Sequence, residues 1–475
     1  MKLAMLEVLS DEDIRLIHEA TLDLLENCGV KVLGARMRSF LEEQGLPVDA
    51  DTGVVRFPRA RVEEAMRHIP AQFEVFDREG ERAFVLGDGV SKIAAGHNAV
   101  FWVDSDTGET RKSTVTDVEQ FARICEVLEH IDMIGIPVMP QDAPDPRATL
   151  LYGVKACVEN SRKPIFFSTD RASVNRAVID MLAAVFPGDM KSRPYGISQL
   201  SPTSPLFWEE GVLEALVDTV ELDVPLAILP EPIAGISSPY TLAGLLTVNN
   251  AECLSGLVMC QLIKPGAKVL YANSWTTTDM RSGFALVGSV ETSVCRIAGA
   301  QLARFYRVPS HTTAPNSDNH AHDEQNAWEK TLSTFCAVGG GNDLIVNCGM
   351  FATGLTCSNE QLIMDEEISA MSRRIAAGIT TNEATIAKDL VAEIGPQGTG
   401  YLNSLHTLEW LRTDEYFMPR VAVRGPHATW AAEGSKDTYA LAREQARKLA
   451  ARASAPLDAE RRARLEAIVS GFVVG

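Results

Sequence analysis

The sequence lacks an excess of positive charge and any long apolar run. Its 44 lysine and arginine residues are outnumbered by 63 aspartate and glutamate residues, which gives a net charge of −19. A surface of this sign repels a phosphate backbone, so we expect no nucleic-acid partner. No apolar stretch approaches the ~18 residues that a membrane span requires, so we also expect no membrane association.

The nine cysteines are an odd number and include no C-x-x-C pair. Scattered cysteines of this kind are typical of buried free thiols in a reducing compartment. The N-terminus reaches charged residues before a signal-peptide core could form. Together these features predict a cytoplasmic protein.

The familiar catalytic motifs are also missing. The chain has no Ser-His-Asp order, no G-x-S-x-G elbow and no reactive-cysteine context. Three glycines at 339–341 stand between a predicted helix and the next strand, where a tight turn is expected rather than a phosphate cradle. The glycine-rich stretch at 395–400 has no preceding strand and no P-loop lysine. These absences argue against nucleotide chemistry and against a serine or cysteine hydrolase.

With 475 residues and 46% hydrophobic content, the chain is long enough for a large globular core. From residue 92 onward, apolar runs of strand length alternate with amphipathic helical stretches. The predicted strands are 92–96, 133–138, 165–168, 195–200, 226–230, 268–273, 310–313 and 344–348. The predicted helices are 116–129, 148–160, 173–186, 208–222, 241–263, 288–306, 324–338 and 359–376. Eight strands each followed by a helix predict an α/β fold of the (β/α)₈ TIM-barrel type.

The flanking segments predict two further regions. We expect an N-terminal α+β cap at 1–91, the catalytic barrel at 92–378, and a C-terminal helical extension at 379–475 packed on the barrel. In the cap, Ser10 and Asp13 form a helix N-cap, and Gly29 ends that helix. We expect a hairpin at 101–110 and, in the extension, helices at 380–393 and 436–453.

Ligands of such barrels bind at the carboxyl ends of the strands. Polar and aromatic residues gather at these ends, most densely in the stretch 309–330 after the seventh predicted strand, which enters its helix at about Asp323. The candidate site residues are His97, Asn98, Gln199, Glu231, Tyr240, Trp275, His311, Asp318, His320, Met350 and Phe351.

Two different chemistries fit these candidates. A methylated ammonium ion cannot donate a hydrogen bond, so proteins bind it with aromatic faces, here Trp275, and with carboxylates, here Glu231 and Asp318. Alternatively, Asp318, His320 and His322 form a D-x-H-x-H cluster that could ligate zinc or iron. No third histidine lies at a familiar spacing, so an exposed loop that orders over substrate is favoured and no metal is expected.

Several stretches together resemble the trimethylamine methyltransferase family, the corrinoid-dependent enzymes of methylamine and betaine metabolism. They are residues 231–244 (EPIAGISSPYTLAG), 250–256 (NAECLSG), 323–330 (DEQNAWEK), 358–367 (SNEQLIMDEE) and 398–407 (GTGYLNSLHT). The similarity runs from residue 9 to about residue 450, nearly the whole chain.

The resemblance implies a (β/α)₈ barrel that moves a methyl group from a substrate nitrogen to the Co(I) of a corrinoid (cobalamin) held on a separate small corrinoid-binding protein. Trimethylamine members carry pyrrolysine, which aligns with the loop of Asn316 and Ser317; this chain has none. A quaternary amine is therefore the expected substrate, with glycine betaine first and proline betaine, carnitine or a sulfonium analogue as alternatives. His97, His311 or His320 would donate to a substrate carboxylate.

The resemblance also implies that no corrinoid is tightly bound to this chain itself, and we expect a homo-oligomer. Two alternatives stay open from the residues alone. One is a metal-dependent barrel lyase or hydrolase that uses Asp318, His320 and His322. The other is a non-catalytic binder of quaternary amines.

Overall fold

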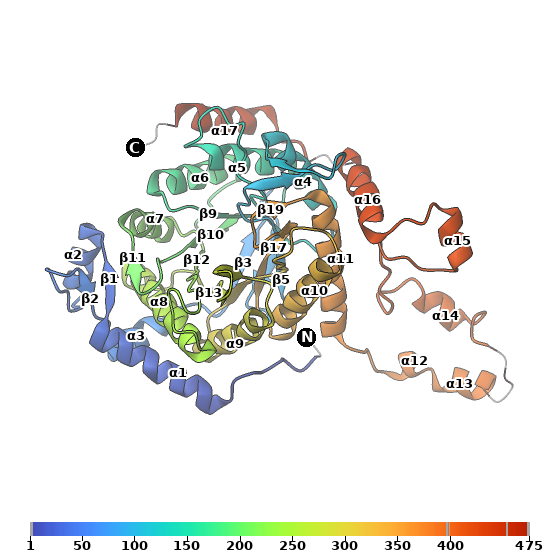
Figure 1. The fold of residues 1–475 in the computed structure, drawn as a ribbon, viewed down its shortest axis with the longest axis horizontal. Coiled ribbons are helices and arrows are strands. Elements are labelled where there is room, and N and C mark those ends of the chain that lie inside the picture. The colour runs from blue at the N-terminus through green and yellow to red at the C-terminus, as the bar shows by residue number, and fades with distance from the viewer. Residues whose placement is uncertain (1–2, 396–397, 399, 453–454, 473–475) are drawn as a thin grey trace.

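The computed structural model describes residues 3–395, 398, 400–452 and 455–472. Eight parallel strands close into a barrel in the order of the sequence, and helices surround it (Figure 1). The strands are β5 (Lys92–Ala95), β8 (Met133–Gly135), β9 (Ile165–Ser168), β10 (Gly196–Leu200), β12 (Leu226–Ile228), β13 (Val269–Asn273), β16 (Ser310–Thr313) and β17 (Leu344–Cys348). The TIM-barrel prediction is confirmed, and each strand lies where the apolar runs place it.

The barrel helices follow their strands in turn. They are α4 (Val115–Val127), α5 (Thr149–Asn160), α6 (Ala172–Val185), α7 (Glu210–Glu221), α8 (Leu242–Ile263), α9 (Val290–Tyr306), α10 (Glu324–Gly339) and α11 (Asn359–Ala377). Asp323 caps α10 by accepting hydrogen bonds from the backbone N–H groups of Gln325 and Asn326, as its position predicts. The turn from α10 to β17 passes through Gly341, which has φ +80°.

Helix α8 is the one described helix whose length and composition would allow it to cross a membrane. Within its most apolar window, 72% of the residues are buried inside the protein. Its apolar character is therefore used in the core, where it packs against α1, α3 and β13.

The N-terminal region contains α1 (Asp11–Asp23), a π-helical turn η1 (Leu24–Cys28), β1 (Val30–Val32), α2 (Ala35–Glu43), β2 (Val54–Val55), α3 (Arg59–Met66), β3 (Phe73–Phe76) and β4 (Arg82–Leu86). Strands β3 and β4 form a hairpin whose apolar side chains join the inward-facing barrel residues in one core cluster. This hairpin closes the amino-terminal end of the barrel, so the opposite end is the one left open for a ligand.

Several short strands lie at the open, carboxyl end of the barrel. Strands β6 (Phe101–Val103) and β7 (Thr110–Lys112) form the hairpin expected at 101–110 and join β18 (Met350–Phe351) and β19 (Thr356–Cys357) in one small sheet. Strands β14 (Thr277–Asp279) and β15 (Phe284–Leu286) form a second hairpin, and β11 (Phe207–Trp208) pairs with β1.

The C-terminal region differs from its sequence-based expectation. The single helix expected at 380–393 is wrong: α12 (Glu383–Ile386) and α13 (Lys388–Ile394) are separated by Ala387, whose φ of +50° lies outside the helical range. Helices α14 (Leu405–Trp410) and α15 (His427–Ala432) follow, then α16 (Thr438–Arg452) and α17 (Ala459–Gly471), the last unpredicted. Part of the glycine-rich stretch at 395–400 lies outside the described residues.

The last two helices pack on the barrel, whereas the four before them project from it. Helix α16 contacts α11 and α4, and α17 contacts α5 and α6. Residues 383–432 are here called the arm, and its four helices, α12 to α15, extend away from the barrel (Figure 1). Between α14 and α15 the arm returns to α11, where Glu367 accepts from the backbone N–H of Arg420 at 2.8 Å and Val421 is buried.

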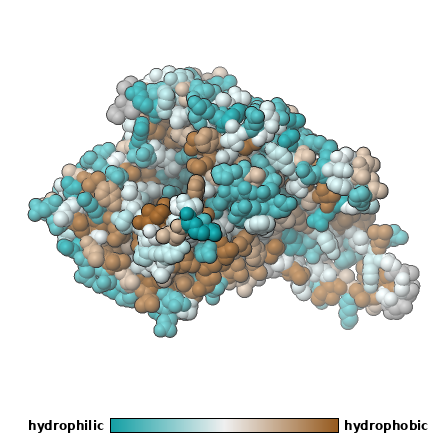
Figure 2. Space-filling model, in the orientation of Figure 1, coloured by the Kyte–Doolittle hydropathy of each residue, from teal (hydrophilic) through white to brown (hydrophobic). Residues whose placement is uncertain are grey.

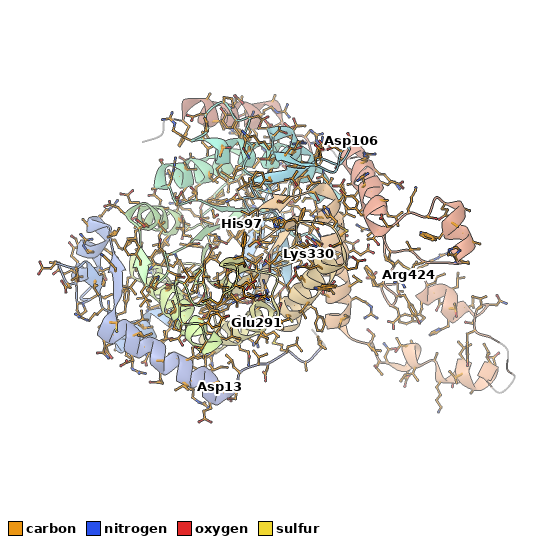
Figure 3. All side chains as sticks on the ribbon, viewed as in Figure 1. Asp13, His97, Asp106, Glu291, Lys330 and Arg424 are labelled. Atoms are coloured by element: carbon orange, nitrogen blue, oxygen red, sulfur yellow. The ribbon has the colours of Figure 1, made fainter. Side chains whose placement is uncertain are left out.

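A buried ion pair ties together the segments after β16 and β17. The Nζ atom of Lys330 donates to Asp365 Oδ2 at 2.8 Å, to the carbonyl oxygen of Pro315 at 3.3 Å and to that of Met350. Asp365 also accepts from the backbone N–H of Gly349 at 2.7 Å. Both charged side chains are fully buried. Lys330 belongs to α10 and is labelled in Figure 3.

This pair generates a prediction on stability. Lys330→Met leaves the Asp365 carboxylate buried without its counter-charge and should lower the free energy of unfolding by about 3–5 kcal/mol. The double variant Lys330→Met, Asp365→Leu should recover much of that loss, because neither charge then remains. Chemical denaturation monitored by circular dichroism measures both.

The matched control is the exposed pair of Arg82 and Glu74, with a closest distance of 2.9 Å. Arg82→Met should change stability by no more than ~1 kcal/mol because solvent screens that pair. Equal losses at both sites would contradict the prediction.

Candidate functional site

A cavity of about 550 Å³ opens at the carboxyl ends of five consecutive strands, from β5 to β12. Figure 2 shows this face of the molecule. The apolar part of its wall includes Met139, Leu150, Val174, Leu200 and Val212. The polar part includes His97, Asn98, Arg147, Ser168, Asp170, Arg171, Gln199, Ser201 and Glu231. No phenylalanine, tyrosine or tryptophan lines it.

A tight turn after β5 brings His97 to this cavity. Gly96 has φ +75°, and a Cβ at this position would lie 2.6 Å from Pro137 Cα, so no larger residue fits the turn. Figure 3 places His97 near the centre of the ring of helices. The next residue, Asn98, donates to Ser168 Oγ at 3.2 Å and so links the ends of β5 and β9.

Gln199 bridges two histidines across the barrel. One end of its carboxamide lies 3.1 Å from His97 Nε2, and the other lies 3.1 Å from His311 Nε2. Burial lowers the pKa of His97 to about 4 and that of His311 to about 3. Both rings are therefore neutral near pH 7, and a neutral imidazole has one donor and one acceptor nitrogen for such a network.

Glu231 follows β12 and has no hydrogen-bond or ion-pair partner among the described residues. Its side chain reaches the water of the cavity, while desolvation by the surrounding protein raises its pKa to about 7. A carboxylate that costs free energy to ionise, and that no described residue neutralises, is suited to a cationic ligand.

Asp318 lies outside this cavity, and the main chain uses both of its oxygens. Oδ1 accepts from the backbone N–H of Val287 at 2.8 Å, and Oδ2 from that of Gly288 at 2.9 Å. The Thr353 hydroxyl also donates to Oδ1 at 3.2 Å. Burial raises the pKa of Asp318. In this structure the carboxylate fastens the turn before α9 to the loop after β16.

The histidines of the D-x-H-x-H stretch separate rather than converge. His320 is exposed and lines a second cavity, of about 530 Å³, with Arg111 and Lys112. His322 packs on Phe351 and Tyr439, with ring centroids 4.6 Å away in each case. Within residues 3–395, 398, 400–452 and 455–472, no three His, Cys, Asp or Glu side chains are grouped closely enough to hold a metal ion.

The remaining candidates lie in other surroundings. Trp275 is buried against Gly299 of α9. Tyr240 is 60% exposed and lies against Gly235. Met350 and Phe351 are buried in β18. None of these four lines the larger cavity.

The cavity also contains polar residues that were not among the candidate site residues, among them Arg147, Ser168, Asp170 and Arg171. Three of them are the last residue of β9 and the two charged residues just beyond it, so the strand-end rule would have found them. Arg147 lies 12 residues after β8, in a loop whose path the sequence does not reveal.

Comparisons with known proteins agree with the fold and narrow the activity. The family model of trimethylamine methyltransferase matches residues 1–471. A trimethylamine methyltransferase of Desulfitobacterium hafniense (strain DSM 10664 / DCB-2) is 31% identical over 439 residues, which cover 92% of this chain and 88% of that protein. A glycine betaine methyltransferase of Desulfitobacterium hafniense (strain Y51) is 30% identical over 470 residues, with coverages of 98% and 96%.

Among solved structures, the monomethylamine methyltransferase of Methanosarcina barkeri matches with a TM-score of 0.53. The match covers 94% of this chain and 88% of the monomethylamine methyltransferase chain. Because the two sequences are only 12% identical, the match shows a shared fold alone. The resemblance predicted from the sequence is confirmed by the family model and by the curated relatives. The chain therefore belongs to the trimethylamine methyltransferase family and is a methyltransferase.

Proposed function

We propose that this enzyme takes a methyl group from a quaternary amine, glycine betaine first among them, and delivers it to the Co(I) of a corrinoid carried by a small partner protein. The observation that carries the proposal is the unpartnered Glu231 carboxylate in the cavity at the strand ends. A quaternary ammonium ion offers charge but no hydrogen-bond donor, so a carboxylate that lacks a donor of its own suits it. The similarity to a glycine betaine methyltransferase and the absence of pyrrolysine support this substrate.

The residues of the cavity hold and orient the substrate. Glu231 neutralises the ammonium charge, and Met139, Leu150 and Leu200 provide apolar contact for its methyl groups. The neutral pair of His97 and Gln199 fixes the floor. The C–N bond breaks with its electron pair remaining on nitrogen, which leaves as a neutral tertiary amine. No general acid is required, so the chain contributes proximity, alignment and exclusion of water.

The methyl acceptor fits the open side of the cavity better than its interior. A volume of about 550 Å³ accommodates a small methylated amine but not a corrin macrocycle. When presented by its partner, the corrinoid supplies the cobalt nucleophile that accepts the methyl group. This division agrees with the expectation that no corrinoid is tightly bound to this chain. All nine cysteines are free, eight of them buried, which supports a reducing cytoplasm as the site of the reaction.

We further propose that the arm mediates a homo-oligomer. None of the residues in its four helices is buried. Its large apolar side chains, many of them more than two-thirds exposed, include Leu402, Leu405, Leu408, Leu411, Tyr416 and Met418. Together they expose on the order of several hundred Å², close to the ~800 Å² per partner of a stable interface. We propose that the arm of a second copy of this chain covers this surface, because that arm presents the same apolar side chains.

A methyl-transfer assay with glycine betaine and a reduced corrinoid protein tests the activity. The wild-type enzyme should methylate the corrinoid, and Glu231→Gln should weaken substrate binding roughly tenfold by removing the counter-charge in a partly desolvated site. The methylated corrinoid is followed by its absorption spectrum, and binding by calorimetry. Lack of transfer from every betaine and sulfonium compound supplied would disprove the proposed activity.

The raised pKa of Glu231 predicts a pH dependence of binding. The carboxyl is protonated below its pKa of about 7 and charged above it, so affinity for the cation should rise between pH 6 and pH 8. His97 and His311, with pKa values of about 4 and 3, stay neutral across this range. Calorimetric titration of Glu231→Gln should give a flat profile. A slope equal to that of the wild type would assign the dependence to another group.

The oligomer proposal is tested by charge on the arm. Leu402→Glu combined with Leu405→Glu should yield a species of lower mass in light scattering coupled to size-exclusion chromatography, because carboxylates cannot enter an apolar interface without a partner. Leu16→Glu is the matched control, since Leu16 is 69% exposed on α1, outside the arm. An unchanged mass for the double variant, or a wild-type protein that is already monomeric, would contradict an interface at the arm.

A further inference from the structure

The wall of the larger cavity carries both signs of charge. Glu231 and Asp170 are acidic, whereas Arg147 and Arg171 are basic. A purely cationic ligand would be served best by a wall of negative charge alone. Two acidic and two basic side chains instead complement a ligand that is itself a zwitterion.

The two arginines differ in how the protein uses them. Arg147 is paired with Asp145, with Nη2 and Oδ2 3.0 Å apart. The guanidinium of Arg171 has no hydrogen-bond or ion-pair partner among the described residues. Only its main chain is engaged: the N–H donates to the Thr169 hydroxyl at 3.2 Å, and the carbonyl oxygen accepts from the backbone N–H of Asn175 at 2.9 Å. Arg171 thus faces the cavity with its five donors free, on a side chain whose planar fork matches a carboxylate.

Arg171 and Glu231 follow strands that are separated by one other strand in the barrel. Arg171 follows β9, Gln199 belongs to β10, and Glu231 follows β12, and these three strands are neighbours. With strands ~4.8 Å apart, the carboxyl ends of β9 and β12 are separated by roughly 10 Å, and Arg171 and Glu231 line the same cavity beyond those ends. A small molecule with its charges a few bonds apart fits between them.

The field of the whole protein makes a local cation necessary for such a ligand. With a net charge of −19, the protein attracts the ammonium end of a zwitterion and repels its carboxylate. A carboxylate therefore requires a specific partner inside the cavity, and an arginine fork supplies one through two parallel hydrogen bonds.

We propose that Arg171, supported by Arg147, binds the carboxylate of the methyl donor and so makes the enzyme selective for zwitterionic methylammonium compounds. This inference rests on the proposed function, because it assigns the second end of the same substrate. Arg171 touches the part of the substrate that does not react, so it acts in binding and selectivity. Its loss should raise KM for a betaine with a smaller effect on kcat.

Two ligands that share the trimethylammonium group separate the two ends. Glycine betaine carries a carboxylate, whereas choline carries a hydroxyl in its place. In calorimetric titrations, Arg171→Gln should weaken the binding of glycine betaine roughly tenfold while that of choline changes less than twofold. Arg171→Lys should recover part of the affinity for glycine betaine, because the charge remains and the fork does not.

Arg176→Gln is the matched control. Arg176 lies on α6, five residues along the chain, is paired with Asp180 at 3.2 Å and does not line the cavity. The Arg176→Gln enzyme should bind glycine betaine and choline as tightly as the wild type does. Thermal melts should be unchanged for all three variants, since both arginines are exposed.

The possible results distinguish this inference from the proposed function beneath it. If Arg171→Gln weakens both ligands equally, or weakens neither, while Glu231→Gln weakens both, the carboxylate role is overturned and the proposed function stands. If the wild-type enzyme binds neither glycine betaine nor choline, the role of Arg171 and the proposed substrate are both disproved. A selective loss of glycine betaine binding in Arg171→Gln, absent in Arg176→Gln, supports the assignment.

Discussion

The open end of this barrel depends on the buried ion pair between Lys330 and Asp365. An ammonium group has three donors, and here a carboxylate and two backbone carbonyl oxygens accept from them. The carboxylate in turn accepts from the backbone of Gly349 and from Gln361 at 2.9 Å. Burial of two charges is tolerated only when all of these bonds form together. The loops after β16 and β17 are therefore held to each other and to α11 in one arrangement.

Around this constraint the barrel mouth divides into two unlike halves. In the half after β13, β16 and β17, the barrel axis is filled and buried charged groups are used by internal bonds, as with Asp318, which accepts from two backbone N–H groups; its cavity, lined by His320, lies further out. The half from β5 to β12 is hollow, and the side chains of Glu231, Asp170 and Arg171 have no partner there among the described residues. Paired charges hold the scaffold in shape, whereas unpaired charges are available to a ligand. This contrast locates the site more sharply than residue type does.

The fold followed from the sequence because its signals are local. Most barrel strands are short apolar runs, β16 being a β-branched polar one, and most helices have an apolar face, although α8 is apolar on all sides. The count of eight could therefore be made without long-range contacts. Local signals failed where the chain interrupts its own pattern. Residues 380–393 have helical composition, yet Ala387 takes a left-handed conformation and divides the helix. Helix α17 was missed because five of its 13 residues are charged and only Leu465 and Val469 are buried, which leaves a weak apolar pattern.

The strand-end rule predicted the correct end of the barrel but could not choose between its halves. Four candidates line the cavity: His97, Asn98 and Glu231, which follow strands, and Gln199, which lies on β10. Four others follow strands of the opposite half: Trp275, Asp318, Met350 and Phe351. Which half is filled depends on contacts between distant residues, such as Gln199 with His97, 102 positions apart. Nothing in a single sequence records those contacts. The polar composition of residues 309–330 predicted a ligand site there. In the structure, many of these polar groups instead form hydrogen bonds within the protein.

Under the proposed function, the carboxylate of Glu231 takes the part that an aromatic cage would otherwise play. Cation–π attraction is valuable where a site can offer only ring faces, but a single carboxylate in a partly desolvated cavity attracts a cation more strongly than one ring does. Glu231 is exposed to the cavity, yet the protein around it raises its pKa to about 7, so ionising this carboxyl costs free energy in the empty site. Under the proposed function, a cationic substrate offsets this cost when it binds. The free energy of bringing Glu231 to its charged form is then recovered only with a ligand of positive charge.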